Sequence, residues 1–166
     1  MKCVASQIAG DITSRRIHLL KDIGSITVRA ALPGDMPAVA RIQVRCAEAA
    51  QWPLGDYTGQ SILLAFINET PVGFAAWRQT APDEAELLNL AVDPQARRRG
   101  VASALLNALG SAAKGDLFLE VAETNTPALT LYRQSGWSEV GVRRGYYHHG
   151  NVNGIVMKKR SWYSPG

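Results

Sequence analysis

The sequence predicts one α/β domain, in which helices flank a sheet that contains several consecutive strands. Its 166 residues correspond to about one domain of average size. A hydrophobic fraction of 46% and a charged fraction of 19% are typical of a globular protein that buries a core. Segments with strand and helix patterns follow one another over residues 26–160, with no repeat and no low-complexity linker between them.

The first half of the chain predicts strands and helices that alternate with turns. Residues 1–25 lack strong periodicity and are expected to form an extension, with a short helix over residues 12–23. The β-branched residues 26–29 predict a strand. A turn follows, with Asp35 as the candidate N-cap of a helix whose apolar residues recur at helical spacing up to Ala47. A weaker helix is expected over residues 57–63, then strands over residues 64–68, 72–78 and 85–92.

The second half predicts two helices and three more strands. An amphipathic helix is expected over residues 100–113, followed by a strand over residues 117–121 in which Glu120 faces away from its apolar neighbours. Asn125 is the expected cap of the next helix, with Pro127 in its first turn and Gly136 at its end. Strands over residues 137–144 and 151–159 complete the domain.

Composition and residue spacing exclude several classes of protein. No apolar run reaches the ~18 residues of a membrane-spanning helix, and the first residues lack the apolar core of a signal peptide. Cys3 and Cys46 provide neither a disulfide framework nor a zinc knuckle, and the adjacent His148 and His149 have no third ligand at a suitable spacing. We therefore expect a cytoplasmic protein without a bound metal. The net charge of +4 favours anionic ligands without choosing among them.

A basic loop between a strand and a helix carries the strongest chemical signal. Arg97, Arg98 and Arg99 precede Gly100, at the predicted start of the long helix. A helix N-terminus presents unpaired N–H groups and a partial positive charge, so it binds phosphates. Gly100 and the small Ala102 allow the backbone to approach a ligand closely. The spacing matches neither of the common phosphate-binding glycine motifs.

This loop resembles the acyl-CoA loop of the GNAT acetyltransferases. Residues 97–102 (RRRGVA) match the family motif [QR]xxGx[GA], and residues 90–94 (LAVDP) match the strand and turn before it. Three further segments are similar to the family: residues 119–137, with LEV, Asn125, LY and SGW; residues 143–147 (RRGYY); and residues 154–157 (GIVM). Within the family, the bacterial ribosomal-protein-alanine N-acetyltransferases are the most similar group that we identify.

The resemblance implies a fold, a reaction and a set of site residues. The fold is a mixed, mostly antiparallel sheet flanked by about four helices, in a domain over residues 26–160 that precedes a short tail over residues 161–166. The reaction transfers an acetyl group from acetyl-CoA to an amine, with Glu120 as the base and Tyr132 as the general acid. Tyr146 and Tyr147 would form one wall of a peptide groove. The acetyl-CoA contacts would come from Leu90, Ala91, Val92, Arg98, Arg99, Gly100, Val101, Ala102, Ser103, Asn125 and Tyr132.

The acceptor that the resemblance implies is the α-amine of a protein N-terminus, including that of a ribosomal protein. An α-amine has a pKa of about 7.7–8.0 and a lysine one of about 10.4, so a modest base suffices for the former. Acetylation of a small free amine, such as an amino acid, a polyamine or an antibiotic, stays open, as does an acyl-CoA-binding protein without catalysis. No Asp or Glu lies between Arg144 and Met157, where the family's alanine acetyltransferases carry acid, so the preferred peptide also stays open.

Other partners are excluded or left open on simpler grounds. The basic residues are divided among several loops and do not form one stripe with interleaved aromatic residues, so no direct nucleic-acid binding is expected. No membrane association is expected either. The sequence allows a monomer or a homodimer.

Overall fold

A seven-stranded sheet runs through the part of the chain that the computed structural model describes, residues 24–147 and 150–160. The strand order is β1-β2-β3-β4-β5-β7-β6. Within these residues every neighbouring pair is antiparallel except β4 with β5, which is parallel. The strands are β1 (Ile26–Ala30), β2 (Ser61–Ile67), β3 (Thr70–Ala81), β4 (Glu84–Val92), β5 (Asp116–Ala122), β6 (Ser138–Tyr147) and β7 (Val152–Lys159). The expected mixed, mostly antiparallel sheet is confirmed. The short helix expected over residues 12–23 and the tail over residues 161–166 lie outside the described residues.

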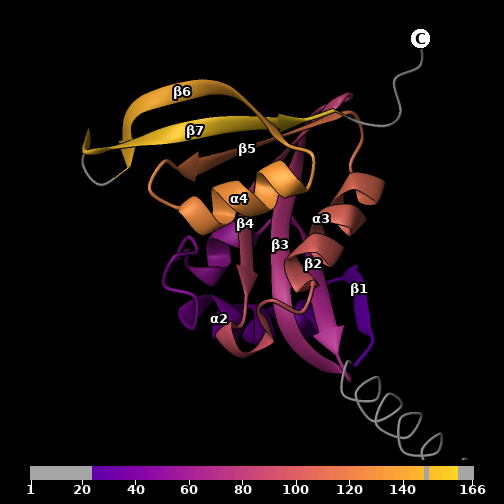
Figure 1. The fold of residues 1–166 in the computed structure, drawn as a ribbon. Helices are drawn as coiled ribbons and strands as arrows, with labels where there is room; N and C mark the ends of the chain where they lie inside the picture. The colour runs from indigo at the N-terminus through magenta and orange to yellow at the C-terminus, as the bar shows by residue number, and fades with distance from the viewer. Residues whose placement is uncertain (1–23, 148–149, 161–166) are drawn as a thin grey trace, which may run out of the picture.

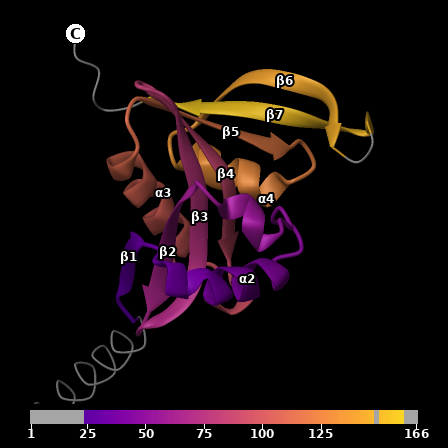
Figure 2. The ribbon, with the colours of Figure 1, turned by 180° about the vertical axis from the view of Figure 1, so that it is seen from behind.

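Helices cover both faces of this sheet (Figures 1 and 2). On one face, α3 (Val101–Ala112) and α4 (Thr126–Gln134) close a core that contains Leu105 and Met157. On the other face, α2 (Met36–Val44) packs Val39 and Ile42 against Phe74 of β3. The central strands are therefore buried on both sides, which explains their nearly continuous apolar sequence.

The structure corrects two expectations for the first half of the chain. The helix expected over residues 57–63 is wrong: a short 3-10 turn, Leu54–Tyr57, precedes β2, in which Ile62 and Leu63 pair with β3. A strand buried on both faces lacks two-residue alternation, so its apolar pattern resembles that of a helix. Asp35 is the N-cap residue of α2, as expected, but its side chain makes no cap hydrogen bond, because its carboxylate accepts from the N–H of Leu32 and pairs with Arg29 at 2.6 Å. The described residues thus contain three α-helices instead of about four.

The two parallel strands separate halfway along their length. β4 and β5 pair from Glu84 with Asp116 up to Leu87 with Leu119, and not beyond. At that point β4 contains a bulge: Trp77 of β3 pairs with Leu87 and Ala76 pairs with Asn89, so Leu88 is the extra residue. A bulge bends its strand and increases the local twist. The second half of β4 therefore remains paired with β3 while its other edge opens toward β5.

Candidate active site

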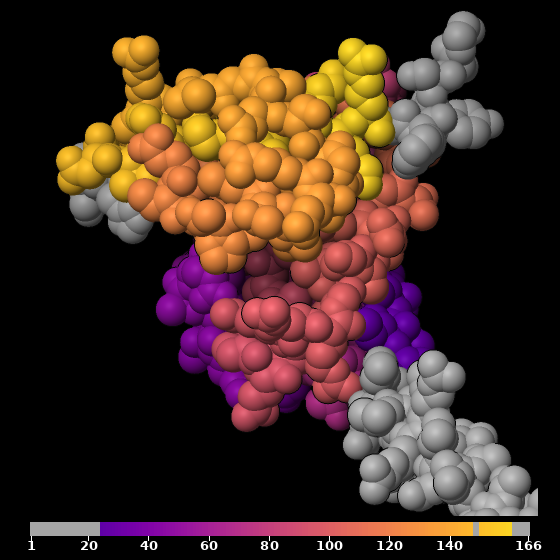
Figure 3. Space-filling view, viewed as in Figure 1, coloured from indigo at the N-terminus to yellow at the C-terminus, as the bar shows by residue number. Residues whose placement is uncertain are grey.

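A pocket of about 530 Å³ occupies the opening between the separated strands. Its walls come from the open halves of β4 and β5, the first turns of α4, the 47–50 segment after α2, and Tyr147 of β6. Figure 3 shows the surface hollowed below α4 at this place. Beyond Leu87, β4 has no ladder partner on the β5 side, so backbone groups along this edge face the pocket. Such an edge can hydrogen-bond an extended ligand and can polarise a carbonyl group with an N–H.

Glu120 enters this pocket from β5. Side chains alternate along the strand, so the buried Leu119 and Val121 place Glu120 on the opposite face. Its side chain is 20% exposed and accepts a hydrogen bond of 2.7 Å from Nη1 of Arg143 on β6. This hydrogen bond raises the pKa of the Arg143 guanidinium, which also lies 4.1 Å from the ring centroid of Tyr146. The expected base therefore has a charged hydrogen-bond partner in this structure.

Tyr132 contributes a phenol to the same pocket from α4. The residue is 8% exposed and packs against Trp137, with 5.9 Å between the ring centroids. Burial raises the pKa of its phenol, and the neighbouring Tyr147 adds to this effect. Burial also raises the pKa of Tyr147, to which the charge of Glu120 contributes. Both phenols are therefore protonated at neutral pH and can donate hydrogen bonds to an anion.

The basic loop adopts a backbone conformation that exposes N–H groups at the start of α3. Arg98 has φ of 60° and Gly100 has φ of 87°, both in the left-handed region. Gly100 is the N-cap of α3 and makes no side-chain cap hydrogen bond, so it leaves the first N–H groups of the helix open to a ligand. Val101 is buried and anchors this end of the helix in the core. Successive N–H groups with this backbone pattern form a concave site for an anion.

The structure divides the residues expected to contact acetyl-CoA into three groups. Leu90, Val92, Ala102, Asn125 and Tyr132 all line the pocket. Asn125 also caps α4, as its Oδ1 accepts a hydrogen bond of 3.3 Å from the N–H of Ala128. The side chains of Ala91 and Val101 are buried in the core. Four exposed residues lie at the start of α3, which adjoins the pocket through Ala102: Arg98, Arg99, Gly100 and Ser103.

Sequence reasoning missed the wall formed by residues 47–50. Asn89 is 6% exposed, and its Nδ2 donates hydrogen bonds to the carbonyl oxygen of Ala50 at 2.9 Å and to the hydroxyl of Tyr57 at 2.8 Å. The Tyr57 hydroxyl in turn donates to Oε1 of Gln43 on α2. This buried network ties the wall to β4 directly after the bulge. An uncharged polar residue within the apolar stretch 87–92 was the available signal.

Arg97 forms a second link to this wall. Its guanidinium pairs with Glu48, and its Nε donates a hydrogen bond of 3.2 Å to the carbonyl oxygen of Val92. Both Arg97 and Glu48 line the pocket. The basic loop and the 47–50 wall are therefore joined across one end of the opening.

The residues that the structure describes contain neither a metal-binding cluster nor a membrane-spanning helix. Over residues 24–147 and 150–160, no three His, Cys, Asp or Glu residues are grouped so that they could hold a metal ion. No helix within the same residues is long and apolar enough to cross a membrane.

This arrangement is that of an acyl-CoA-dependent acyltransferase. An open strand edge and a helix start suited to phosphates adjoin one pocket, which also contains a carboxylate and a buried phenol. Residues 34–137 match the model of the acetyltransferase (GNAT) family, and the chain belongs to this family. The family and fold predicted from the motifs are thereby confirmed.

Two of the proteins similar to this chain are named as ribosomal-protein-alanine N-acetyltransferases, and a third is named Ard1. The ribosomal protein bS18-alanine N-acetyltransferase of Salmonella typhimurium is 33% identical over 133 residues, which are 74% of this chain and 89% of that protein. The crystal structure of the ribosomal-protein-S18-alanine N-acetyltransferase from Escherichia coli has a TM-score of 0.74 and 28% identity, covering 84% of this chain and 96% of that one. The structure of Ard1 from Thermoplasma volcanium has a TM-score of 0.75 and 26% identity, covering 83% and 99%.

Proposed function

We propose that this protein transfers the acetyl group of acetyl-CoA to the α-amine of a protein N-terminus, including that of a ribosomal protein. The observation that carries the proposal is the pocket at the open edge of β4, which holds Glu120 on one wall and Tyr132 on another. The names of the Salmonella and Escherichia coli relatives support the choice of acceptor. We place the reaction in the cytoplasm.

The start of α3 would hold the anionic end of acetyl-CoA. The N–H groups from Arg98 to Ser103 would bind the pyrophosphate, and the arginines would add positive charge. The backbone of residues 90–92 would hydrogen-bond the pantetheine arm along the unpaired edge of β4. An N–H group on this edge would stabilise the oxyanion that forms when the amine attacks the thioester carbonyl.

Glu120 and Tyr132 would act on the two sides of the reacting carbonyl. The amine nitrogen forms a bond to the carbonyl carbon, and Glu120 takes a proton from this nitrogen directly or through a water. The C–S bond then breaks with its electron pair on sulfur. Tyr132, which is protonated at neutral pH, would donate a hydrogen bond to the departing thiolate.

Tyr146 and Tyr147 would contact the acceptor. Tyr147 lines the pocket, and Tyr146 is 50% exposed beside it, with 5.0 Å between the two ring centroids. The rings can pack on the first peptide residues while the hydroxyl groups bond the peptide main chain. Such contacts reject a single amino acid, which offers no second residue to hold.

A comparison of acceptors tests the proposal. We expect a peptide that begins with Ala or Ser to be acetylated much faster than the same amino acid as a free amide, or a polyamine. The double variant Tyr146→Ala/Tyr147→Ala should raise KM for the peptide and leave acetyl-CoA affinity unchanged, as measured by calorimetry. Equal turnover of the free amide or polyamine, with normal behaviour of the double variant, would instead support the small-amine acetyltransferase.

A further inference from the structure

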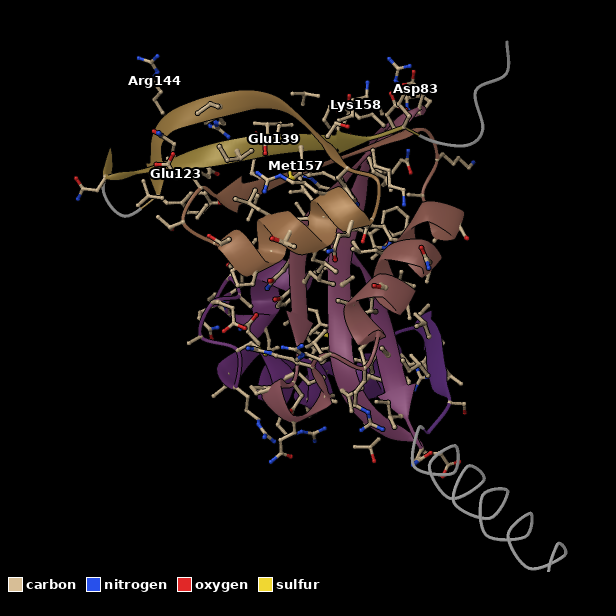
Figure 4. All side chains as sticks on the ribbon, viewed as in Figure 1. Asp83, Glu123, Glu139, Arg144, Met157 and Lys158 are labelled. Carbon is tan, nitrogen blue, oxygen red and sulfur yellow. The ribbon has the colours of Figure 1, made fainter. Side chains whose placement is uncertain are left out.

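A side-chain bracket joins the end of β5 to the β6–β7 hairpin through Asn153. The N–H and Nδ2 of Asn153 donate hydrogen bonds of 3.0 Å to the two carboxylate oxygens of Glu123. Its Oδ1 accepts a hydrogen bond of 3.0 Å from the N–H of Gly145. The N–H of Glu123 donates to the carbonyl oxygen of Asn153, also at 3.0 Å. Figure 4 shows Glu123 beneath this hairpin, whereas Arg144 points outward from it.

The bracket supports a point where the strand ladder is interrupted. The register of β6 with β7 shifts between Arg143 and Tyr147, and Gly145 has a left-handed φ of 62°. A backbone N–H at such a break needs an acceptor outside the regular ladder. The Oδ1 of Asn153 is that acceptor. A side chain on β7 therefore fixes the kink in β6.

An asparagine meets the chemical requirements of this position. The N–H of Gly145 can only donate, and both carboxylate oxygens of Glu123 accept hydrogen bonds here. The residue between them must therefore present an acceptor on one side and a donor on the other. An amide does both, whereas an aspartate would place a second carboxylate against Glu123.

The kink determines where the two tyrosines lie, because Tyr146 and Tyr147 follow Gly145 directly. A Cβ added at Gly154 would lie 3.4 Å from Cβ of Tyr146 and 3.4 Å from Cε2 of Tyr147. Both side chains are therefore seated on the bare backbone of β7, one residue after Asn153. Because Glu120 lies near the end of β5 and Glu123 directly follows this strand, the bracket sets the tyrosines relative to the expected base.

We propose that Asn153 and Glu123 form a positioning pair that holds Tyr146 and Tyr147 in place on β7, and that the pair thereby sets the affinity for the acceptor. The proposal rests on the proposed function only for the identity of that acceptor. The pair touches no reacting atom. It acts through the backbone of the hairpin.

A reciprocal substitution tests the pair. We expect Asn153→Asp to raise KM for the Ala-starting peptide by roughly tenfold, through displacement of the acceptor wall. Its affinity for acetyl-CoA should stay within about twofold, because position 153 belongs to neither α3 nor β4, the elements expected to hold the pyrophosphate and the pantetheine arm. Hydrogen exchange at the Gly145 amide should accelerate by about tenfold or more, because repulsion between the new carboxylate at position 153 and that of Glu123 would move the side chain at position 153 away from the Gly145 N–H.

The second variant exchanges donor and acceptor. Adding Glu123→Gln to Asn153→Asp provides an amide donor at position 123. The two oxygens of the carboxylate at position 153 can then accept from this amide and from the N–H of Gly145. KM and Gly145 exchange should return close to the wild-type values. Asn151→Asp is the matched control: it makes the same charge change at an exposed residue of the same hairpin and should alter neither quantity.

Each result bears on a separate part of the proposal. Unchanged Gly145 exchange in Asn153→Asp, or no recovery in the double variant, would overturn the pairing. Faster exchange with an unchanged KM would show that the bracket is structural and has no effect on the acceptor. If the wild-type enzyme acetylates no peptide, the proposed function fails. Hydrogen exchange at Gly145 and KM for the amine that is acetylated would then still decide the role of the Asn153–Glu123 pair.

Discussion

Removing the hydroxyl of Tyr132 distinguishes two roles that the pocket allows for this residue. Burial raises the pKa of the phenol above its usual value of 10, so the hydroxyl is protonated throughout the neutral range. A thiol has a pKa of about 8.5. Complete proton transfer from Tyr132 to the departing thiolate is therefore uphill, whereas donation of a hydrogen bond requires no such transfer. We expect Tyr132 to act as a hydrogen-bond donor to sulfur.

The two roles predict losses of different size for Tyr132→Phe. A hydrogen bond to a charged group contributes about 1.5–3 kcal/mol, which corresponds to a roughly 10- to 150-fold fall in kcat. General acid catalysis contributes about 10²- to 10⁴-fold. The ring contact with Trp137 at 5.9 Å persists in the variant, so the free energy of unfolding should change little. We therefore expect the smaller loss.

The assay is kcat at saturating acetyl-CoA and acceptor between about pH 6 and 9, with acetyl-CoA affinity measured by calorimetry and stability by urea unfolding. The shape of the pH profile should be the same in Tyr132→Phe and the wild type, because the phenol does not ionise in this range. A loss of less than twofold would remove Tyr132 from the reaction. A loss beyond about 10³-fold would refute the hydrogen-bond role in favour of proton transfer.

Four further changes test the catalytic base, the phosphate site, the buried network and an acidic ion pair. Glu120→Gln should lower kcat by roughly 10²-fold or more and remove the acid limb of the pH–rate profile, with acetyl-CoA affinity unchanged; full activity at neutral pH would exclude the base role. Arg99→Glu should weaken acetyl-CoA binding in calorimetry by roughly 1–3 kcal/mol, whereas Arg144→Glu, the same charge change on β6, should not; equal affinities would remove the pyrophosphate from this loop. Tyr57→Phe leaves Gln43 and Asn89 each without one buried partner, so the free energy of unfolding in urea should fall by about 2–4 kcal/mol, and a change below about 0.5 kcal/mol would contradict the network. The hydrogen bond from Arg29 lowers the pKa of Asp35 from 3.8 to about 2. The pair therefore stabilises the fold above pH 3.8 and loses this effect as the pH falls toward 2. Asp35→Asn should flatten the dependence of the free energy of unfolding on pH in that window, and a dependence identical to that of the wild type would show that the pair contributes nothing.

Local signals in the sequence predicted the elements whose structure depends on neighbouring residues. Asn125 caps α4, and Gly136 ends it with a φ of 85°, because a cap and a left-handed turn involve only adjacent residues. Alternation along residues 117–121 placed Glu120 opposite Leu119. The glycine after three arginines marked the start of α3. The helix expected over residues 57–63 failed, because a strand covered on both faces has no alternation to distinguish it from a helix.

Pairing between distant segments decided the rest of the site. The opening between β4 and β5 depends on the bulge at Leu88, and a bulge is defined only by the register of β4 against β3. Glu120 and its partner Arg143 are 23 residues apart in the sequence. They meet across β7, because β5 and β6 pair with its two edges.

The sequence by itself determined the family, and it predicted the helix start expected to bind phosphate and the two side chains expected to act on the reacting groups. Each of these rests on a short motif with a fixed local geometry. Only the tertiary structure decided which walls surround those side chains. The 47–50 segment is tied to the pocket through Asn89. Tyr147 lines the pocket from the hairpin that Asn153 joins to Glu123, 30 residues away in the sequence. The physical reason is that a buried or bridging amide must match the donors and acceptors that surround it in the folded protein. These groups come from distant strands, whose order and register depend on the packing of the whole sheet.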